Sequence, residues 1–289
     1  MNAATRLRQL LAQPEIVVAP GAYDGLTARL VQQAGFSAVY MTGAGTAAAR
    51  GFPDFGLIGM SEMVENAAVL ARTVEIPLIA DADTGYGNEL NVTRTVREFE
   101  ARGVAAIHLE DQVFSKRCGH LDGKEIVDRD EFLAKIRAAV AARRNPDFVI
   151  IARTDARAVV DLDEAITRAN LALEAGADMA FVEAPRTREE VALIPKEVKG
   201  PCLLNLVPAG RTPLVPFTEA QEMGYRMVIL PGLLLKAVVE ASDAALQEVR
   251  RSGEMPPLKI DATVAELFRR FGSDEWSVLR HRFQKANQE

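Results

Sequence analysis

The sequence predicts an α/β fold, a closed (β/α)8 barrel of the TIM type, on three observations. Eight short apolar runs alternate with longer amphipathic segments, the pattern of parallel strands joined by helices. The tripeptides AGF, RGV, AGA and MGY each stand just before a strand, where their glycine suits a helix C-cap. The length of 289 residues is ordinary for one such barrel. A doubly wound open sheet is the alternative, but it usually has fewer strands, and no glycine-rich nucleotide fingerprint follows the first strand here.

The predicted elements follow one another in regular order. The strands are Ile16–Ala19, Ala38–Met41, Leu78–Ala80, Ala105–Leu109, Phe148–Ala152, Met179–Val182, Cys202–Asn205 and Met227–Leu230. The helices between them include Gly25–Ala34, Ser61–Thr73, Val92–Arg102 and Arg129–Ala142. Because SGEMPP is typical of a linker, we expect residues 1–255 to form the barrel and 256–289 a helical extension.

The extension carries apolar side chains that need a partner, on the same subunit or on a neighbouring one. They are Leu267, Phe268, Phe271, Trp276, Leu279 and Phe283.

The bulk composition excludes several classes of function. With 48% hydrophobic residues, 26% charged residues and a net charge of −6, the chain is typical of a globular protein that does not bind nucleic acid. Two cysteines and a start without an apolar signal core predict a reducing cytoplasm. The apolar run Met227–Leu235 is too short to span a bilayer, so we expect no membrane role. A net acidic protein must capture an anionic substrate with a local cluster of cations and backbone N–H groups.

Acidic residues follow two neighbouring predicted strands. Asp81 and Asp83 follow the third strand, and Glu110 follows the fourth. Carboxylates stacked at adjacent strand ends repel one another unless a cation lies between them, and hard oxygen ligands suit Mg²⁺, with Mn²⁺ as a substitute. The alternative is structural, with Asp81 and Asp83 capping the next helix or pairing with arginine.

The pentapeptide KRCGH at residues 116–120 is the sharpest motif. Cys118 lies beside two cations and His120, a setting that favours thiol reactivity and anion binding, and Gly119 can offer its N–H to a ligand. The alternative is a solvated basic loop with an incidental cysteine. Cys202 lies in an apolar strand and is expected to be a buried small hydrophobe.

Polar residues that could capture a carboxylate end three further strands. Arg153 follows the fifth strand, Glu183 the sixth and Asn205 the seventh. A guanidinium grips a carboxylate bidentately, and an amide can donate to a second oxygen. Arg153 could instead form only an ion pair with Glu183. After the second strand, Gly43 and Gly45 either bring backbone N–H groups close to an anion or form a plain turn.

These residues resemble the isocitrate lyase and phosphoenolpyruvate mutase superfamily over nearly the whole chain. The resemblance rests on GFPD at 51–54, DADTGYGN at 81–88, HLEDQ at 108–112 and KRCGH at 116–120, the last being similar to the catalytic loop of the lyase branch. It implies a barrel whose last helix is exchanged between subunits, usually in a homotetramer. It implies Mg²⁺ held by Asp81 and Asp83, with Asp54 and Glu110 in or near its shell. It also implies that Thr42, Gly43 and Ala44 line the substrate and that Arg153, Glu183 and Asn205 contact its carboxylate and hydroxyl groups. Cys118 and Gly119 would belong to a mobile catalytic loop, with Gly119 also binding the substrate.

Within this superfamily, departures from the methylisocitrate lyase pattern bear on the substrate. The segment after Asn205 lacks the Thr and Glu of those enzymes, and Lys236 stands in place of an Arg that binds their extra carboxylate. The resemblance therefore favours a 2-hydroxy-dicarboxylate of the alkylmalate type, such as 2,3-dimethylmalate cleaved to pyruvate and propionate. Methylisocitrate cleavage is the first alternative and oxaloacetate hydrolysis or decarboxylation the second. Phosphonate chemistry and a non-catalytic dicarboxylate-binding barrel complete the alternatives.

The expected chemistry is a retro-aldol-type cleavage. Tyr40, or water near Glu110, accepts the hydroxyl proton. Arg153, His120 and backbone N–H groups stabilise the enediolate that develops on the departing carboxylate, and Cys118 protonates the new carbanion carbon as general acid.

Overall fold

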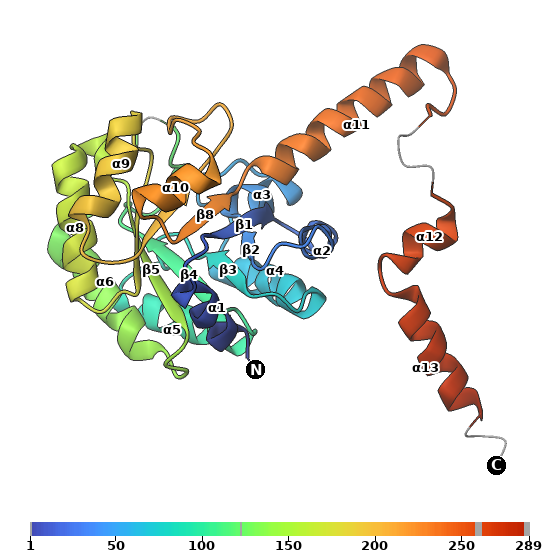
Figure 1. The fold of residues 1–289 in the computed structure, drawn as a ribbon, viewed down its shortest axis with the longest axis horizontal. Coiled ribbons are helices and arrows are strands. Elements are labelled where there is room, and N and C mark those ends of the chain that lie inside the picture. The colour runs from blue at the N-terminus through green and yellow to red at the C-terminus, as the bar shows by residue number, and fades with distance from the viewer. Residues whose placement is uncertain (1, 122, 258–261, 286–289) are drawn as a thin grey trace. The chain divides into compact units, whose positions relative to one another are not determined.

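Eight parallel strands close into a barrel in chain order, from β1 beside β2 round to β8 beside β1 (Figure 1). The structure is a computed structural model that describes residues 2–121, 123–257 and 262–285. The closed eight-stranded barrel predicted from the sequence is thereby confirmed. Its strands are β1 Val17–Ala22, β2 Val39–Met41, β3 Leu78–Asp81, β4 Ala106–Glu110, β5 Val149–Thr154, β6 Met179–Val182, β7 Cys202–Asn205 and β8 Met227–Leu230.

The first strand is longer than its sequence indicates. The predicted run ended at Ala19 because Pro20 and Gly21 usually interrupt strands. In the barrel β1 continues to Ala22, since Pro20 aligns with Leu230 of β8 and Gly21 aligns with Tyr40 of β2. A Cβ atom on Gly21 would lie 2.6 Å from the Cα atom of Pro231, so only glycine allows this close approach.

The helices are those expected between parallel strands, with additions at both ends of the chain. They are α1 Ala3–Ala12, α2 Gly25–Gln33, α3 Gly43–Ala49, α4 Met60–Thr73, α5 Glu89–Ala101, α6 Arg129–Ala142, α7 Ala156–Val159, α8 Leu162–Glu174, α9 Arg188–Glu197, α10 Phe217–Met223, α11 Leu233–Ser252, α12 Val264–Arg269 and α13 Ser273–Lys285. The predicted C-cap glycines all have positive φ, from 82° at Gly103 to 110° at Gly224, as such caps require. In the part of the chain that the structure describes, no helix is long and apolar enough to cross a membrane.

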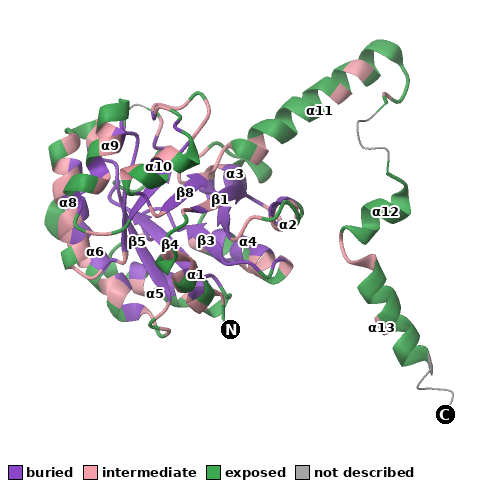
Figure 2. Cartoon of the chain, viewed as in Figure 1, coloured by how far each residue is buried: buried purple, intermediate pink, exposed green. Residues whose placement is uncertain are grey.

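The barrel interior is filled by apolar side chains that point inward from all eight strands, and Figure 2 shows the strands as buried. Among them are Ala19, Ile79, Ile151, Phe181 and Ile229. Leu7 of α1 is fully buried against this cluster, so α1 packs over the amino-terminal end of the barrel. Polar side chains are thereby left to the opposite end, where the strands finish and where barrel enzymes carry their active sites.

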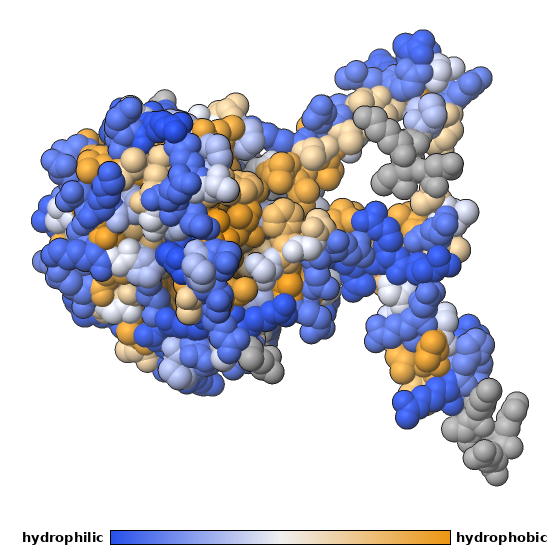
Figure 3. Space-filling model, viewed as in Figure 1, coloured by the Kyte–Doolittle hydropathy of each residue, from blue (hydrophilic) through white to orange (hydrophobic). Residues whose placement is uncertain are grey.

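The chain divides into two compact units, Met1–Ala237 and Val238–Glu289. The second consists of the greater part of α11 together with α12 and α13. Large apolar side chains are exposed on its helices, and Figure 3 shows apolar surface there. They include Leu246, Phe268, Trp276 and Phe283.

Candidate active site

The carboxyl ends of the strands surround a cavity of about 100 Å³, enough for a few water molecules or one small organic acid. Most residues proposed from the sequence line it, namely Tyr40, Thr42, Ala44, Asp54, Asp81, Cys118, Gly119, His120, Arg153, Glu183 and Asn205. The other three, Gly43, Asp83 and Glu110, contact residues of this lining. The structure therefore brings together all the residues proposed for the site.

Asp81, at the end of β3, accepts hydrogen bonds on both carboxylate oxygens. The backbone N–H of Gly43 donates to Oδ2 at 3.2 Å, and that of Asp83 donates to Oδ1 at 3.0 Å. A Cβ atom on Gly43 would lie 2.5 Å from Oδ2, so this position accepts only glycine. Burial acts to raise the pKa of Asp81, but His108, Lys116 and Arg153 outweigh burial and lower it to about 2. Asp81 is therefore ionised near neutral pH.

A lysine that the sequence analysis did not assign to the site lies among the acidic residues. The Nζ atom of Lys116 is 2.7 Å from Oδ1 of Asp54 and 2.9 Å from Oδ1 of Asp83. Burial acts to lower the pKa of Lys116, but Asp83, Asp81 and other neighbouring carboxylates hold it well above its usual value. The carboxylate repulsion that suggested a cation is thus partly relieved by a side chain of the protein. The signal was available in the sequence, because Lys116 is the first residue of KRCGH.

The acidic residues near the cavity are not arranged as a set of direct metal ligands. Among the described residues, no group of three or more His, Cys, Asp or Glu side chains is arranged to hold a metal ion directly. Glu110 is fully buried, and neither of its carboxylate oxygens accepts a hydrogen bond from a described residue. Burial raises the pKa of Glu110 well above its usual value. Buried polar atoms without hydrogen-bond partners are costly, and the water shell of a bound cation would donate hydrogen bonds to Glu110.

Arg153 lies beside Glu110 in the register of β4 and β5 and is held by several carboxylates. Its Nε atom is 3.0 Å from Oδ2 of Asp155 and 3.3 Å from Oε2 of Glu110. Its Nη2 atom is 3.9 Å from Oε2 of Glu183, so the ion pair considered from the sequence is the longest of the three. Burial acts to lower the pKa of Arg153, but these acids raise it well above its usual value.

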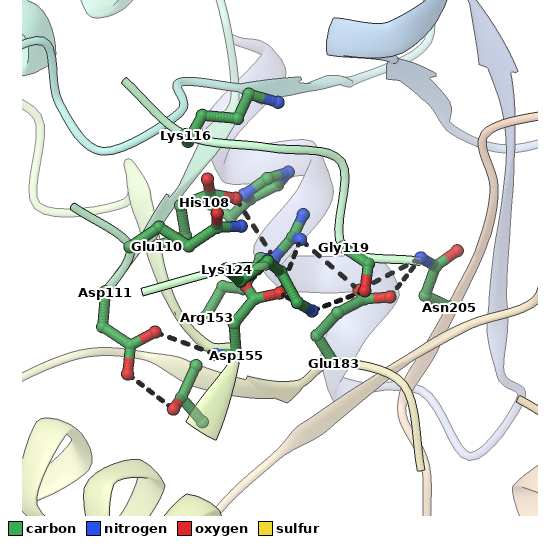
Figure 4. Close-up of polar contacts among 12 residues, drawn as sticks. His108, Glu110, Asp111, Lys116, Gly119, Lys124, Arg153, Asp155, Glu183 and Asn205 are labelled. Atoms are coloured by element: carbon green, nitrogen blue, oxygen red, sulfur yellow. Dashed lines mark hydrogen bonds and ion pairs between the residues drawn. The ribbon is translucent and has the colours of Figure 1, made fainter. Parts of the chain in front are cut away.

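Glu183 and Asn205 lie beside one another, as their places at the ends of β6 and β7 predicted. Nδ2 of Asn205 donates to Oε2 of Glu183 at 3.1 Å (Figure 4). Nδ1 of His120 accepts from the backbone N–H of Arg211 at 3.1 Å, so a neutral His120 carries its proton on Nε2, which is 3.2 Å from Oε1 of Glu183. Burial lowers the pKa of His120, which favours that neutral ring.

The KRCGH loop is packed against the cavity. The backbone N–H of Cys118 donates to the carbonyl of Asp54 at 3.2 Å. A Cβ atom on Gly119 would lie 2.4 Å from Nη2 of Arg153 and 2.8 Å from Cγ of Glu183, so glycine alone allows the loop this close. Cys118 is half-buried and borders the cavity, whereas Cys202 is buried in β7 as predicted.

Comparison with known proteins identifies the family. A family model described as phosphoenolpyruvate phosphomutase matches residues 7–250. The chain belongs to the phosphoenolpyruvate mutase/isocitrate lyase superfamily. A 2,3-dimethylmalate lyase of Eubacterium barkeri is 44% identical over 288 residues, covering 98% of this chain and 99% of its own. A 2-methylisocitrate lyase of Aeropyrum pernix is 44% identical over 247 residues, covering 86% of this chain and 80% of its own.

Solved structures of the superfamily agree with this assignment. Oxaloacetate acetylhydrolase in complex with the inhibitor 3,3-difluorooxalacetate superimposes with a TM-score of 0.94 at 41% identity, over 98% of this chain and 97% of that one. Phosphonopyruvate hydrolase, solved with oxalate and Mg²⁺, superimposes with a TM-score of 0.88 at 33% identity, over 98% of this chain and 100% of that one. Members of the superfamily thus bind Mg²⁺, and this chain is a carbon–carbon lyase of the superfamily.

Beyond Lys116, the sequence analysis of this superfamily member missed two further sets of site residues. His108 lies inside the barrel on β4, with Nε2 2.7 Å from the hydroxyl of Tyr40. Burial lowers the pKa of His108 to about 4 and raises that of Tyr40 well above its usual value. Lys124 and Asp155 form a buried ion pair of 2.6 Å beside Arg153. His108 could have been found from HLEDQ, but no local pattern pairs Lys124 with Asp155.

The protonation state of Cys118 can be tested directly. Burial raises the pKa of its thiol above the usual 9.0, so little of the reactive thiolate exists at neutral pH. We expect iodoacetamide to alkylate Cys118 slowly at pH 7, and the rate to climb without a plateau until the pH exceeds 9. Mass spectrometry of the alkylated peptide over a pH series measures this rate. A plateau below about pH 8 would show an activated thiolate instead, which cannot serve as a general acid.

Proposed function

We propose that this lyase cleaves a 2-hydroxy-dicarboxylate of the alkylmalate type in a Mg²⁺-dependent reaction. The substrate that fits best is 2,3-dimethylmalate, which gives pyruvate and propionate. The observation that carries the proposal is the composition of the cavity lining, which combines two cationic side chains with several apolar ones. The similarity to the Eubacterium barkeri enzyme over the full length supports it.

The lining of the cavity supplies groups for both parts of an alkylmalate. Lys116 and Arg153 are the Lys and Arg side chains of its described lining, and they suit the two carboxylates. The apolar side chains of the lining suit methyl groups, and they are Phe181, Val207, Ile229, Pro231 and Leu235. Burying one methyl group stabilises a complex by about 1 kcal/mol, whereas an unpaired carboxylate there would cost far more.

The position considered for a third carboxylate is already engaged. The Nζ atom of Lys236 donates to the carbonyl of Pro208, and Lys236 does not line the described cavity. A tricarboxylate would therefore lack a cation for its extra group. This favours a dicarboxylate over methylisocitrate.

The carboxylates at the carboxyl ends of the strands suit a hydrated Mg²⁺ ion, with Mn²⁺ as a substitute. We propose Asp81 and Asp83 as its holders, with Asp54 and Glu110 in or near the shell. The oxygens of Glu110, which accept no hydrogen bond from a described residue, and the lowered pKa of Asp81 support this arrangement. When bound, the ion would polarise the 2-hydroxyl and adjacent carboxylate of the substrate.

The residues of the chain then move the protons. Either a water near Glu110 accepts the proton of the 2-hydroxyl, or Tyr40 accepts it while passing its own proton to His108, whose Nε2 atom is 2.7 Å away. The bond between C2 and C3 breaks, C2 becomes the carbonyl carbon of pyruvate, and the electron pair stays on C3. Arg153, His120 and Asn205 stabilise the charge that spreads onto the departing carboxylate. Cys118 donates its proton to C3, which completes propionate.

An assay of 2-keto acid release with Mg²⁺ tests the proposal. The panel is malate, citramalate, 2,3-dimethylmalate, isocitrate and methylisocitrate, with product identification by chromatography. We expect pyruvate from 2,3-dimethylmalate with kcat/KM at least ~10-fold above that for the other substrates, because one methyl group contributes ~1 to 3 kcal/mol of discrimination. A higher kcat/KM for methylisocitrate would contradict the substrate assignment.

The alternative substrate is oxaloacetate, supported by the similarity to oxaloacetate acetylhydrolase. Incubation with oxaloacetate separates the two, because hydrolysis releases oxalate and acetate, and decarboxylation releases pyruvate. Release of any of these above the rate without enzyme would favour that alternative.

We also propose that residues 1–255 form the catalytic domain and that the extension 256–289 packs on a neighbouring subunit of a homotetramer, with its last helix exchanged. The exposed apolar side chains of Phe268, Trp276 and Phe283 support this, since large apolar side chains on helices usually pack against a partner. Light scattering after size-exclusion chromatography measures the oligomeric state. A monomer at micromolar concentration would contradict the proposal.

A further inference from the structure

A second lysine of the KRCGH loop region, Lys124, is buried without lining the cavity. Its Nζ atom is 2.6 Å from Oδ1 of Asp155 and 2.5 Å from the carbonyl oxygen of Gly119 (Figure 4). Only 2% of its side chain is exposed, and none of the side chain of Asp155 is. Removing two charges from water costs several kcal/mol per ion unless both are well paired. A buried lysine outside the lining of the cavity therefore needs an explanation.

Asp155 connects this lysine to the substrate-binding arginine. Its Oδ2 atom accepts from Nε of Arg153 at 3.0 Å, while Oδ1 faces Lys124. Its own backbone N–H donates to Oδ1 of Asp111 at 2.8 Å, and Asp111 also accepts from the hydroxyl of Thr154 at 2.7 Å. Both ends of Asp155 are thus held by neighbouring groups. One carboxylate joins the loop to the guanidinium.

The carbonyl that accepts from Lys124 belongs to Gly119, which is tightly packed. Gly119 packs against Arg153 and Glu183 so closely that a single added Cβ atom would overlap both. Its neighbours in the chain are Cys118 and His120, both of which border the cavity. A shift of Gly119 therefore displaces the thiol and the imidazole together.

We propose that Lys124 is a positioning residue, which holds the carbonyl of Gly119 and, through Asp155, sets the Cys118 loop in register with Arg153. The assignment of Cys118 as proton donor rests on the proposed function. The position of the loop does not, so the two can be tested apart. A buried ion pair with a purely structural role would change stability alone.

The test compares three variants under identical conditions with Mg²⁺ present. Lys124→Met keeps the length of the side chain and removes its charge and donors, whereas Lys124→Arg keeps both. Lys135→Met is the matched control, because Lys135 on α6 is also buried and paired, at 2.9 Å with Glu131, away from the cavity. Each variant is measured for thermal midpoint, kcat, KM and the rate at which iodoacetamide alkylates Cys118.

In Lys124→Met we expect kcat to fall about 10- to 100-fold with little change in KM, as misplacement of a reacting group does. We expect alkylation of Cys118 to become several-fold faster, because a released loop exposes the thiol, with Cys202 unaffected. Lys124→Arg should recover part of kcat and slow the alkylation. Lys135→Met should change the thermal midpoint at most.

An unchanged alkylation rate in a folded Lys124→Met variant would overturn the proposal, as would equal effects in Lys135→Met. If Lys124→Met does not fold, Lys124→Gln takes its place under the same criteria, because Gln loses the charge and is one bond too short to hold the carbonyl of Gly119. If no substrate of the panel is turned over, the proposed function fails while the alkylation rates still decide the role of Lys124.

Discussion

Replacing Cys118 with serine is expected to lower kcat by about 10²- to 10⁴-fold while leaving the fold and Mg²⁺ binding intact. The thiol borders the cavity, and burial holds its pKa high enough for it to keep its proton. An alcohol is far less acidic than a thiol, so serine at the same place donates a proton to carbon much more slowly. Steady-state kinetics, calorimetric titration with Mg²⁺ and thermal melting measure the three properties.

The matched control for this variant is Cys202→Ala. Cys202 is buried in β7, and burial raises its pKa to about 12, so its removal should lower stability but spare kcat. Near-normal turnover in Cys118→Ser would show that Cys118 is not the general acid and only contributes contacts within the loop.

Replacing Asp81 with asparagine is expected to lower the Mg²⁺-dependent rate by about 10³-fold, since metal polarisation of the substrate contributes several kcal/mol. Asparagine keeps the size of the side chain but loses its charge. In the unmodified chain the N–H groups of Gly43 and Asp83 donate to the two carboxylate oxygens of Asp81. In the variant, the NH2 group of asparagine takes the place of one of these oxygens and cannot accept a hydrogen bond. Calorimetry should show weakened Mg²⁺ binding, and the rate should rise only at much higher Mg²⁺ concentrations.

Asp161→Asn provides the control with the same chemical change. Asp161 caps α8 by accepting from the backbone N–H of Glu164 at 2.8 Å, and asparagine caps helices equally well. We expect it to match the unmodified chain in both rate and Mg²⁺ affinity. If Asp81→Asn kept its Mg²⁺ dependence at the original concentration, Asp81 would not be a ligand of the ion.

The barrel could be predicted because each parallel strand has a recognisable pattern within its own short stretch of sequence. Strands buried on both faces are short apolar runs, so β6, β7 and β8 have the same bounds in the sequence and in the structure. The strand that differs most is β1, where Pro20 and Gly21 suggest an end. Pairing with β2 on one side and β8 on the other extends β1 to Ala22, and β8 is far away in the chain.

The candidate site could be predicted in outline for a related reason. Residues after the strands meet at one end of a barrel, so Asp81, Arg153, Glu183 and Asn205 were expected together before any distance was known. The hydrogen-bond and ion-pair partners of these residues could not be predicted, because they depend on the directions of side chains across the barrel. The carboxylates of Asp54 and Asp83 share a lysine from the KRCGH loop.

By itself, the sequence determined the barrel, the side of it that carries the chemistry, and the membership in a lyase superfamily, because strand patterns and catalytic motifs are local. Only the tertiary structure decided that Lys116 lies among the acids, that His108 contacts Tyr40, and that Lys124 joins the loop to Asp155. Such contacts depend on closing the barrel, since ion pairs and hydrogen bonds of this kind form between residues that sequence spacing leaves unrelated. The protonation states of the site follow from the same closure, because burial and the neighbouring charges together set them.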